Sequence, residues 1–123
     1  LDDQYTAATA RFAHYVGAFA VPGDTPRAIR AASRCEAMGA VLLADRAAGR
    51  DPGPLAPAFE AAAAHVLAHL HGSSNSWFVA QPEQVRGAMR LGLLDGQLRI
   101  DANKHAARCL LRAWQWRSAL RTG

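Results

Sequence analysis

The chain has 123 residues, a length that fits one domain of ordinary size. Half of its residues are hydrophobic, but 28 residues are alanine, so the core that the chain can build alone is thin. We therefore expect a protein partner or a second copy to cover part of the apolar surface. The chain has 13 arginines and one lysine and a net charge of +4. These basic residues are scattered along the sequence, which argues against a nucleic-acid-binding face. No apolar run reaches the roughly 20 residues of a membrane span.

The sequence predicts a first helix over residues 3–20. Aromatic side chains recur there with helical spacing and would share one face of the helix. These side chains are Tyr5, Phe12, Tyr15 and Phe19. Residues 21–24, with the sequence Val-Pro-Gly-Asp, then end the helix.

A second helix is predicted over residues 26–48, with Thr25 as its N-cap and Pro26 in its first turn. Gly49 ends it. Two apolar stripes run along this helix on roughly opposite sides, and a helix that is apolar on two faces is usually buried on both. We therefore expect it to be the central helix of the fold.

The third helix follows the Asp-Pro-Gly-Pro loop and reaches about residue 71. A long irregular loop comes next, with one helical turn over residues 82–86. A turn at Asp95-Gly96 would pair residues 89–91 with residues 98–100. The last helix covers residues 101–119, with Asp101 as its N-cap. The fold class is therefore all-α: about four helices in two hairpins, joined by one long irregular loop, in a single domain over residues 1–123.

Glu36 is the first candidate for chemistry, because it lies within an apolar stripe of the second helix. A buried carboxylate needs a partner or a raised pKa, so we expect Glu36 to be mostly buried and paired with Arg99 or, as second choice, Arg90. His105 lies one turn after Asp101 and would share or orient the charge. A general acid or base at Glu36 and a purely structural salt bridge both fit this pattern.

Two cysteines and a pair of histidines are further candidates for chemistry. Cys35 and Cys109 can form only one bridge, and two cysteines do not make a disulfide scaffold, so free and partly buried thiols are expected. The compartment stays open, with the cytoplasm favoured. His65 and His69 have a spacing that suits zinc, but Val66 replaces the glutamate of the zinc-protease motif and no third ligand is evident. We therefore predict no metal and no cofactor.

Several aromatic side chains are further candidates for contact with a ligand or a partner. Trp77 and Phe78 follow a serine-rich stretch and are predicted to contact a ligand or a partner, together with Arg90 and Asp101. Trp114 and Trp116 point to different faces of the last helix. One of the two tryptophans should lie in the core, and the other should lie at an interface.

Four short motifs occur in a fixed order: SRCEA at residues 33–37, SSNSWF at 73–78, RGAMR at 86–90 and RID..KHA at 99–106. In this order the chain resembles the closing helical hairpins of an α/α toroid, the barrel of paired helices found in several glycan-processing and cyclase-type enzymes. The resemblance implies a pocket lined by helix ends and their loops. It also implies that the chain is a fragment or subunit of a larger barrel, because a complete toroid contains many more than four helices.

Three functions remain open at this point. The first is a helical subunit or segment of a toroid-like assembly, which acts through contact with a larger partner chain or a sister copy. The second is a small enzyme whose polar pocket holds Glu36, Arg99 and His105. In that enzyme Glu36 would move a proton and Arg99 would hold an anionic group. The third is a small helical adaptor or regulator.

Overall fold

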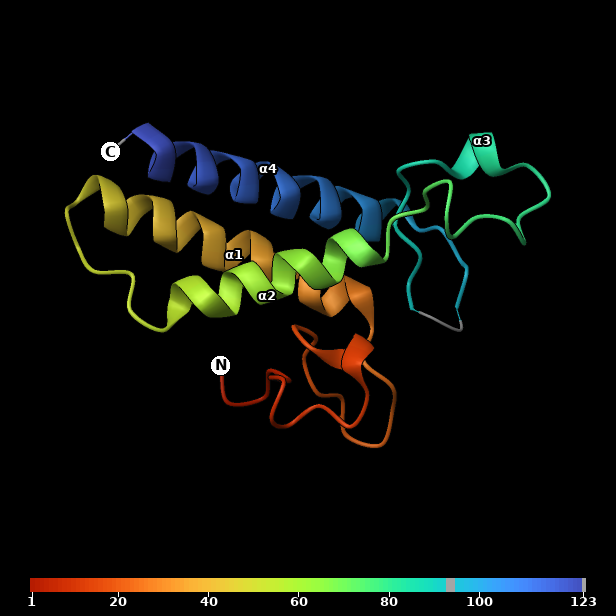
Figure 1. Ribbon diagram of the computed structural model, residues 1–123, viewed down its shortest axis with the longest axis horizontal. Helices are drawn as coiled ribbons and strands as arrows, with labels where there is room; N and C mark the ends of the chain where they lie inside the picture. Colours follow the sequence, from red (N-terminus) through yellow and green to blue (C-terminus); the bar gives the residue numbers. More distant parts are fainter. Residues whose placement is uncertain (93–94, 123) are drawn as a thin grey trace.

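The computed structural model describes residues 1–92 and 95–122, and it is all-helical (Figure 1). Three long helices dominate: α1 (Ala28–Ala47), α2 (Leu55–Ala68) and α4 (Ile100–Thr122). A single turn forms α3 (Pro82–Val85), and a 3-10 turn, η1, covers Ala13–Tyr15. In the described part of the chain, β structure is confined to isolated bridges. The expected all-α class is confirmed.

Helix α1 is the centre of the fold. It packs against both α2 and α4, whereas these two helices contact each other less. The prediction of a central helix is therefore confirmed, but both neighbours cover one wide arc of α1, and the exposed residues Ala37, Ala40 and Val41 lie on its other side. The buried positions of α1 are Ala28, Ala31, Ala32, Cys35, Met38, Gly39 and Leu42.

Gly39 lies where α1 is in tight contact with both α2 and α4. A Cβ atom on Gly39 would lie 2.6 Å from the Cβ of Arg112 on α4 and 2.8 Å from Cε2 of Phe59 on α2. Both distances are far below a normal carbon–carbon contact. Any larger residue at this position would therefore push α1 away from α4.

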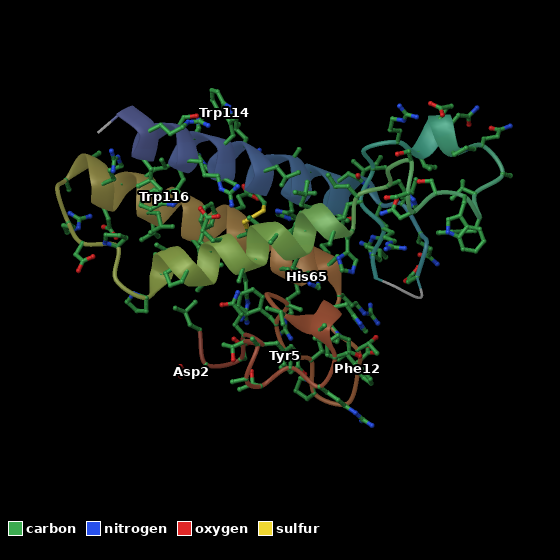
Figure 2. The ribbon with its side chains drawn as sticks, in the orientation of Figure 1. Asp2, Tyr5, Phe12, His65, Trp114 and Trp116 are labelled. Carbon is green, nitrogen blue, oxygen red and sulfur yellow. A yellow bond between two sulfur atoms is a disulfide. The ribbon has the colours of Figure 1, made fainter. Side chains whose placement is uncertain are left out.

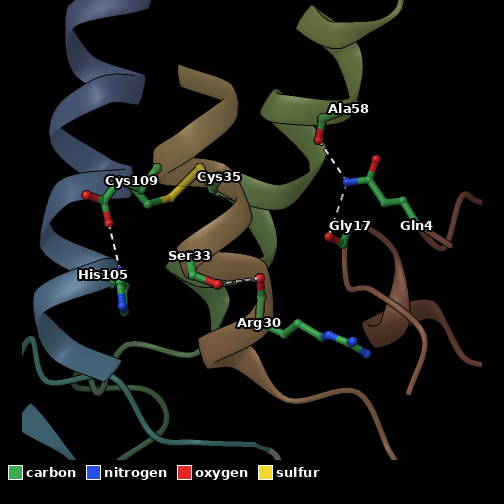
Figure 3. Close-up of a disulfide and its surroundings, with 9 residues drawn as sticks. Gln4, Gly17, Arg30, Ser33, Cys35, Ala58, His105 and Cys109 are labelled. Carbon is green, nitrogen blue, oxygen red and sulfur yellow. Dashed lines mark hydrogen bonds and ion pairs between the residues drawn. A yellow bond between two sulfur atoms is a disulfide. The ribbon is translucent and has the colours of Figure 1, made fainter. Parts of the chain in front are cut away.

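A disulfide joins α1 to α4 through Cys35 and Cys109 (Figure 3). Both residues are fully buried, and their Cα atoms are 5.2 Å apart, within the usual range for a disulfide. The expectation of free thiols was wrong, because only the packing of α1 on α4 brings together two cysteines that are 74 residues apart. Disulfides persist mainly in oxidising compartments, so the bridge argues against a cytoplasmic location.

The N-terminal segment, residues 1–27, is not the helix that its aromatic spacing predicts. It folds back on itself, so that Gln4 pairs with Phe19 in a β-bridge. Gly17 lies directly against α2 with φ of +85°, and a side chain there would overlap the backbone of Ala61. Tertiary contact with α2 therefore replaces helix formation. The side chain of Gln4 strengthens this contact by donating a 2.8 Å hydrogen bond to the Ala58 carbonyl oxygen.

Two predicted helix starts also differ from the structure. Arg27 occupies the N-cap position of α1 without a capping side-chain hydrogen bond, and Thr25 instead hydrogen-bonds Asp24. Asp101 lies within the first turn of α4 rather than at its cap. An acidic residue in the first turn still interacts favourably with the positive end of the helix.

The third helix and the loop that follows agree better with the sequence. Helix α2 ends at Ala68, slightly before the predicted position, and α3 matches the predicted turn. The pairing expected around Asp95-Gly96 is present as one bridge between Arg90 and Leu98. Residues 93–94 of that predicted hairpin lie outside the described residues.

A membrane-spanning helix is not found within the described residues, since each of their helices is too short or too polar for that role.

The disulfide should supply a large part of the stability of this fold. We expect reduction of the wild-type protein to lower its free energy of unfolding by about 3–4 kcal/mol, because the bridge closes a long loop in the unfolded chain. Urea denaturation of oxidised and reduced protein would measure the change. A Cys35→Ala/Cys109→Ala variant serves as control, since reductant should not affect it. Equal midpoints for oxidised and reduced wild type would contradict the prediction.

Candidate functional site

A charged cluster spans α1 and α4 next to the disulfide. We call it the Glu36 cluster, and it consists of Glu36, His105 and Arg108. His105 Nδ1 lies 2.7 Å from Glu36 Oε2, and Arg108 donates a 3.1 Å hydrogen bond to Glu36 Oε1. Figure 3 shows His105 close to Cys109 on α4. The hydrogen bond from His105 and then the charge and hydrogen bond of Arg108 hold the Glu36 pKa below its usual range.

The structure brings together only part of the predicted catalytic set. Glu36 and His105 are in contact, but Arg99 forms a two-pronged ion pair with Asp101 instead, at 3.0 and 2.8 Å. The predicted Glu36–Arg99 pairing was therefore wrong. Arg108 takes that place because it lies three residues after His105, so both side chains reach Glu36 from one face of α4.

The Glu36 side chain is 23% exposed and that of His105 is 28% exposed. Glu36 is therefore mostly buried, as predicted, although its side chain lies at the edge of the α1–α4 contact. Arg90, the second predicted partner, is partly buried, and its Nε atom has no hydrogen-bond partner within the described structure. The cluster is a partly buried ion-pair network at the edge of the α1–α4 contact.

One of the two tryptophans of α4 lies in the core and the other does not, as the sequence predicts. Trp116 is buried among the long helices, whereas Trp114 is 64% exposed (Figure 2). Trp77 is 83% exposed, and its ring meets that of Phe78 edge-on at 5.5 Å between centroids. Trp77 and Phe78 are therefore accessible to a ligand or a partner, as the predicted contact role requires.

A cleft of about 460 Å³ lies between the N-terminal segment, α2 and the loop before α4. Sequence reasoning missed it, because one of its walls is formed by residues that were expected to be helical. The N-terminal segment contributes Phe12, His14, Tyr15, Asp24, Thr25, Pro26 and Arg27 to its lining, the end of α2 contributes His65 and His69, and the loop contributes Leu91, Gly92 and Asp95.

Two buried histidines form part of the cleft wall. The rings of His65 and His69 lie 4.3 Å apart, and His69 Nδ1 is 2.8 Å from the His65 carbonyl oxygen. A carbonyl oxygen only accepts, so Nδ1 of His69 carries the proton and its Nε2 presents a lone pair. Burial lowers the pKa of His65 to about 4, with a smaller effect of His69, and burial also lowers the pKa of His69. Both rings are therefore neutral at neutral pH.

Metal binding at these histidines would need further ligands. His71 does not extend the pair, since its ring contacts the Ser76 hydroxyl at 3.3 Å. Within residues 1–92 and 95–122, no three His, Cys, Asp or Glu side chains are grouped so that they could hold a metal ion.

Comparison with known proteins does not add to this geometry: no protein-family model matches the chain, and neither a curated protein nor a solved structure does.

Replacement of Glu36 should separate a structural role from a catalytic one. We expect Glu36→Gln to lower the free energy of unfolding by about 1 kcal/mol at pH 7, since partly exposed ion pairs are screened by water. Because the folded pKa of Glu36 is lowered, this contribution is present above its unfolded pKa and is lost as pH falls through the folded pKa. Chemical denaturation at several pH values would measure it.

Glu83→Gln, which breaks an exposed ion pair with Arg86, serves as the matched control and should have little effect. A stability that stays flat or rises in Glu36→Gln at neutral pH would instead favour a catalytic carboxylate.

The buried His65 should make the fold sensitive to acid. Its folded pKa of about 4 lies below the usual value of 6.5, so the unfolded chain binds the proton first as pH falls. We expect stability to drop by about 2 kcal/mol between pH 7 and pH 4.5 on this account. His65→Gln should show a smaller drop, measured as the pH slope of the free energy of unfolding. Glu36→Gln, which keeps His65, should retain the wild-type slope in this range. Equal slopes for His65→Gln and wild type would refute the assignment.

Proposed function

We propose that this chain is a helical assembly module, which packs as closing hairpins of an α/α toroid-like array against a larger partner chain or a sister copy. The observation that carries the proposal is an exposed apolar ridge on α4. The ridge consists of Ile100, Ala107, Leu111 and Trp114. Three of these residues are large, and their exposed fractions are 92% for Ile100, 50% for Leu111 and 64% for Trp114.

The α4 ridge lies opposite the face of α4 that packs on α1 and α2. Its members are separated by seven, four and three residues and therefore share one side of the helix. The buried side is formed by Ala102, Ala106, Cys109 and Trp116. A helix that is apolar on two sides is normally covered on both, and a contiguous exposed apolar patch commonly marks a contact surface.

The order of the helices supports an array of hairpins. Helices α1 and α2 form one hairpin, and α4 lies beside α1 and parallel to it (Figure 1). The register of this parallel pair is constant, since Cys35 meets Cys109 and the Arg46 side chain donates to the Ala119 carbonyl oxygen. In stacked helical hairpins, equivalent helices of successive hairpins lie side by side in this way. The α4 ridge is the face on which a further helix of such an array would pack.

Basic side chains flank the ridge and fit the polar rim of an interface. Lys104 and Arg108 are exposed on α4 next to Leu111 and Ala107. In Figure 2, Trp114 points away from α1 and α2, in the position of an anchor residue. Tryptophan in the centre of an interface often carries a large share of the binding energy.

A small enzyme at the Glu36 cluster is the second candidate. The 2.7 Å contact between Glu36 and His105 favours it, because a carboxylate can orient an imidazole for proton transfer. Arg108 would then replace Arg99 as the group that holds an anion. The ion pairs of Glu36 hold its pKa below the usual range, which suits a permanently charged structural carboxylate better than a general acid or base at neutral pH, so the assembly role is preferred.

The assembly role is tested by the oligomeric state. In the absence of another partner, we expect the ridge to drive self-association that sedimentation equilibrium detects between micromolar and submillimolar concentrations. Trp114→Ala should weaken this association by about 30-fold or more, as loss of an interface anchor does. Leu67→Ala removes an apolar side chain of α2 outside the ridge, 59% exposed against 64% for Trp114, and should leave association unchanged. A wild type that stays monomeric, or equal effects of the two variants, would count against the proposal.

A further inference from the structure

The cleft beside His65 and His69 is independent of the α4 ridge. In Figure 1 the N-terminal segment lies on the opposite side of the helices from α4. The volume of about 460 Å³ is in the range of pockets that take small molecules. The following inference therefore does not rest on the proposed function.

One wall of the cleft contains a polar atom without a partner. His65 is 5% exposed, and its Nε2 atom makes no hydrogen bond within the described residues. Buried polar atoms in native proteins are nearly always satisfied, either by protein, by water or by a ligand. Figure 2 places His65 between α2 and the N-terminal segment, on the side of the cleft. The backbone groups of Val16 and His14 also act on this ring and raise its pKa, so an occupant of the cleft would meet the other polar groups of the lining first.

The polar groups of the cleft are mostly acceptors. Nε2 of His69 presents a lone pair, and Asp24 and Asp95 present carboxylate oxygens. Arg27 is the basic side chain of the lining, and its charge is taken up by a 3.0 Å ion pair with Asp24. Asp95 accepts a hydrogen bond from the Gln97 amide and makes no ion pair with any described basic side chain. Among the described residues of the lining, Asp95 is therefore the acidic side chain that no ion pair neutralises.

Aromatic rings form the other wall. Phe12, His14 and Tyr15 contact one another, with centroid distances of 5.5 Å for Phe12–His14 and 4.7 Å for His14–Tyr15. The faces of such rings attract cations, and the Arg11 guanidinium already lies over the Phe12 ring, 5.3 Å from its centroid. The Phe12 ring also stacks on His14, so it offers a ligand apolar contact. Arg90 is a nearby positive charge that would disfavour a cation in the cleft. It acts on His69 from outside the lining and is not a wall of the cleft.

From these features we infer that the cleft is a binding site for a small organic ammonium ion. Its N–H groups would donate to Asp95 and to Nε2 of His69, and its apolar body would lie against Phe12 and Tyr15. An anion would meet the unpaired carboxylate of Asp95 and the lone pair of His69 Nε2. A neutral molecule would gain nothing from the charge of Asp95. An ammonium ion satisfies these acceptors while its apolar body packs on the aromatic wall.

Benzylammonium at pH 7 is a suitable probe, and benzyl alcohol is its neutral match in size. Chemical-shift titration should show that benzylammonium binds to the residues of the cleft, with an affinity at least about tenfold higher than that of benzyl alcohol. Asp95→Asn should abolish this preference, because the amide keeps the acceptor oxygen for the Gln97 amide but loses the charge. Tyr15→Leu should weaken benzylammonium binding more than benzyl alcohol binding. Glu83→Gln, which removes a charge outside the cleft, should change neither affinity.

Three results would overturn the inference. One is equal or tighter binding of benzyl alcohol. Another is binding of a neutral polyol such as glucose in the cleft without binding of the amine. The third is the absence of binding by every probe at millimolar concentration. Thermal unfolding of each variant would identify any that fails to fold, and for these the probe comparison on the wild type decides the outcome alone.

Discussion

The rest of the structure depends on the contact between α1 and α4. These helices run parallel in one register, and the contact is closed by the Cys35–Cys109 bridge and by the missing side chain of Gly39. The close approach at Gly39 brings large side chains of α2 and α4 onto a helix that is itself rich in alanine. A thin alanine core stabilises weakly, since each alanine removes little apolar surface from water. The covalent link offsets this weakness by restricting the unfolded chain, as it does in other small domains.

The same contact determines what lies on its two edges. At one edge, Glu36 of α1 meets His105 and Arg108 of α4 in a partly buried network. On the far side of α4, the α4 ridge faces away from the core with its apolar residues uncovered. In the proposed array, the parallel register would make α4 the first helix of a second hairpin. A hairpin array that continues over the ridge would cover both the apolar residues and the rim around Glu36.

The N-terminal segment produces a different kind of surface. Its fold depends on Gly17, which approaches the backbone of α2 more closely than any other residue type could. This contact sets Phe12 and Tyr15 opposite the end of α2, where His65 and His69 are desolvated and neutral. The cleft is therefore a product of docking between a non-helical segment and a helix end. Its acceptor-rich chemistry differs from the apolar character of the α4 ridge, and the two surfaces suit different kinds of ligand.

The sequence by itself determined the features that depend on local periodicity. It predicted the central helix, the helical turn at residues 82–86, the all-α class and the division of Trp114 and Trp116 between surface and core. The tertiary structure decided which distant residues meet. Cys35 pairs with Cys109, Arg108 replaces Arg99 beside Glu36, and Gly17 docks on α2 in place of a first helix. Periodicity could not predict these contacts, because it describes one face of one helix. The register between helices depends on the packing of all of them together, which only the folded chain provides.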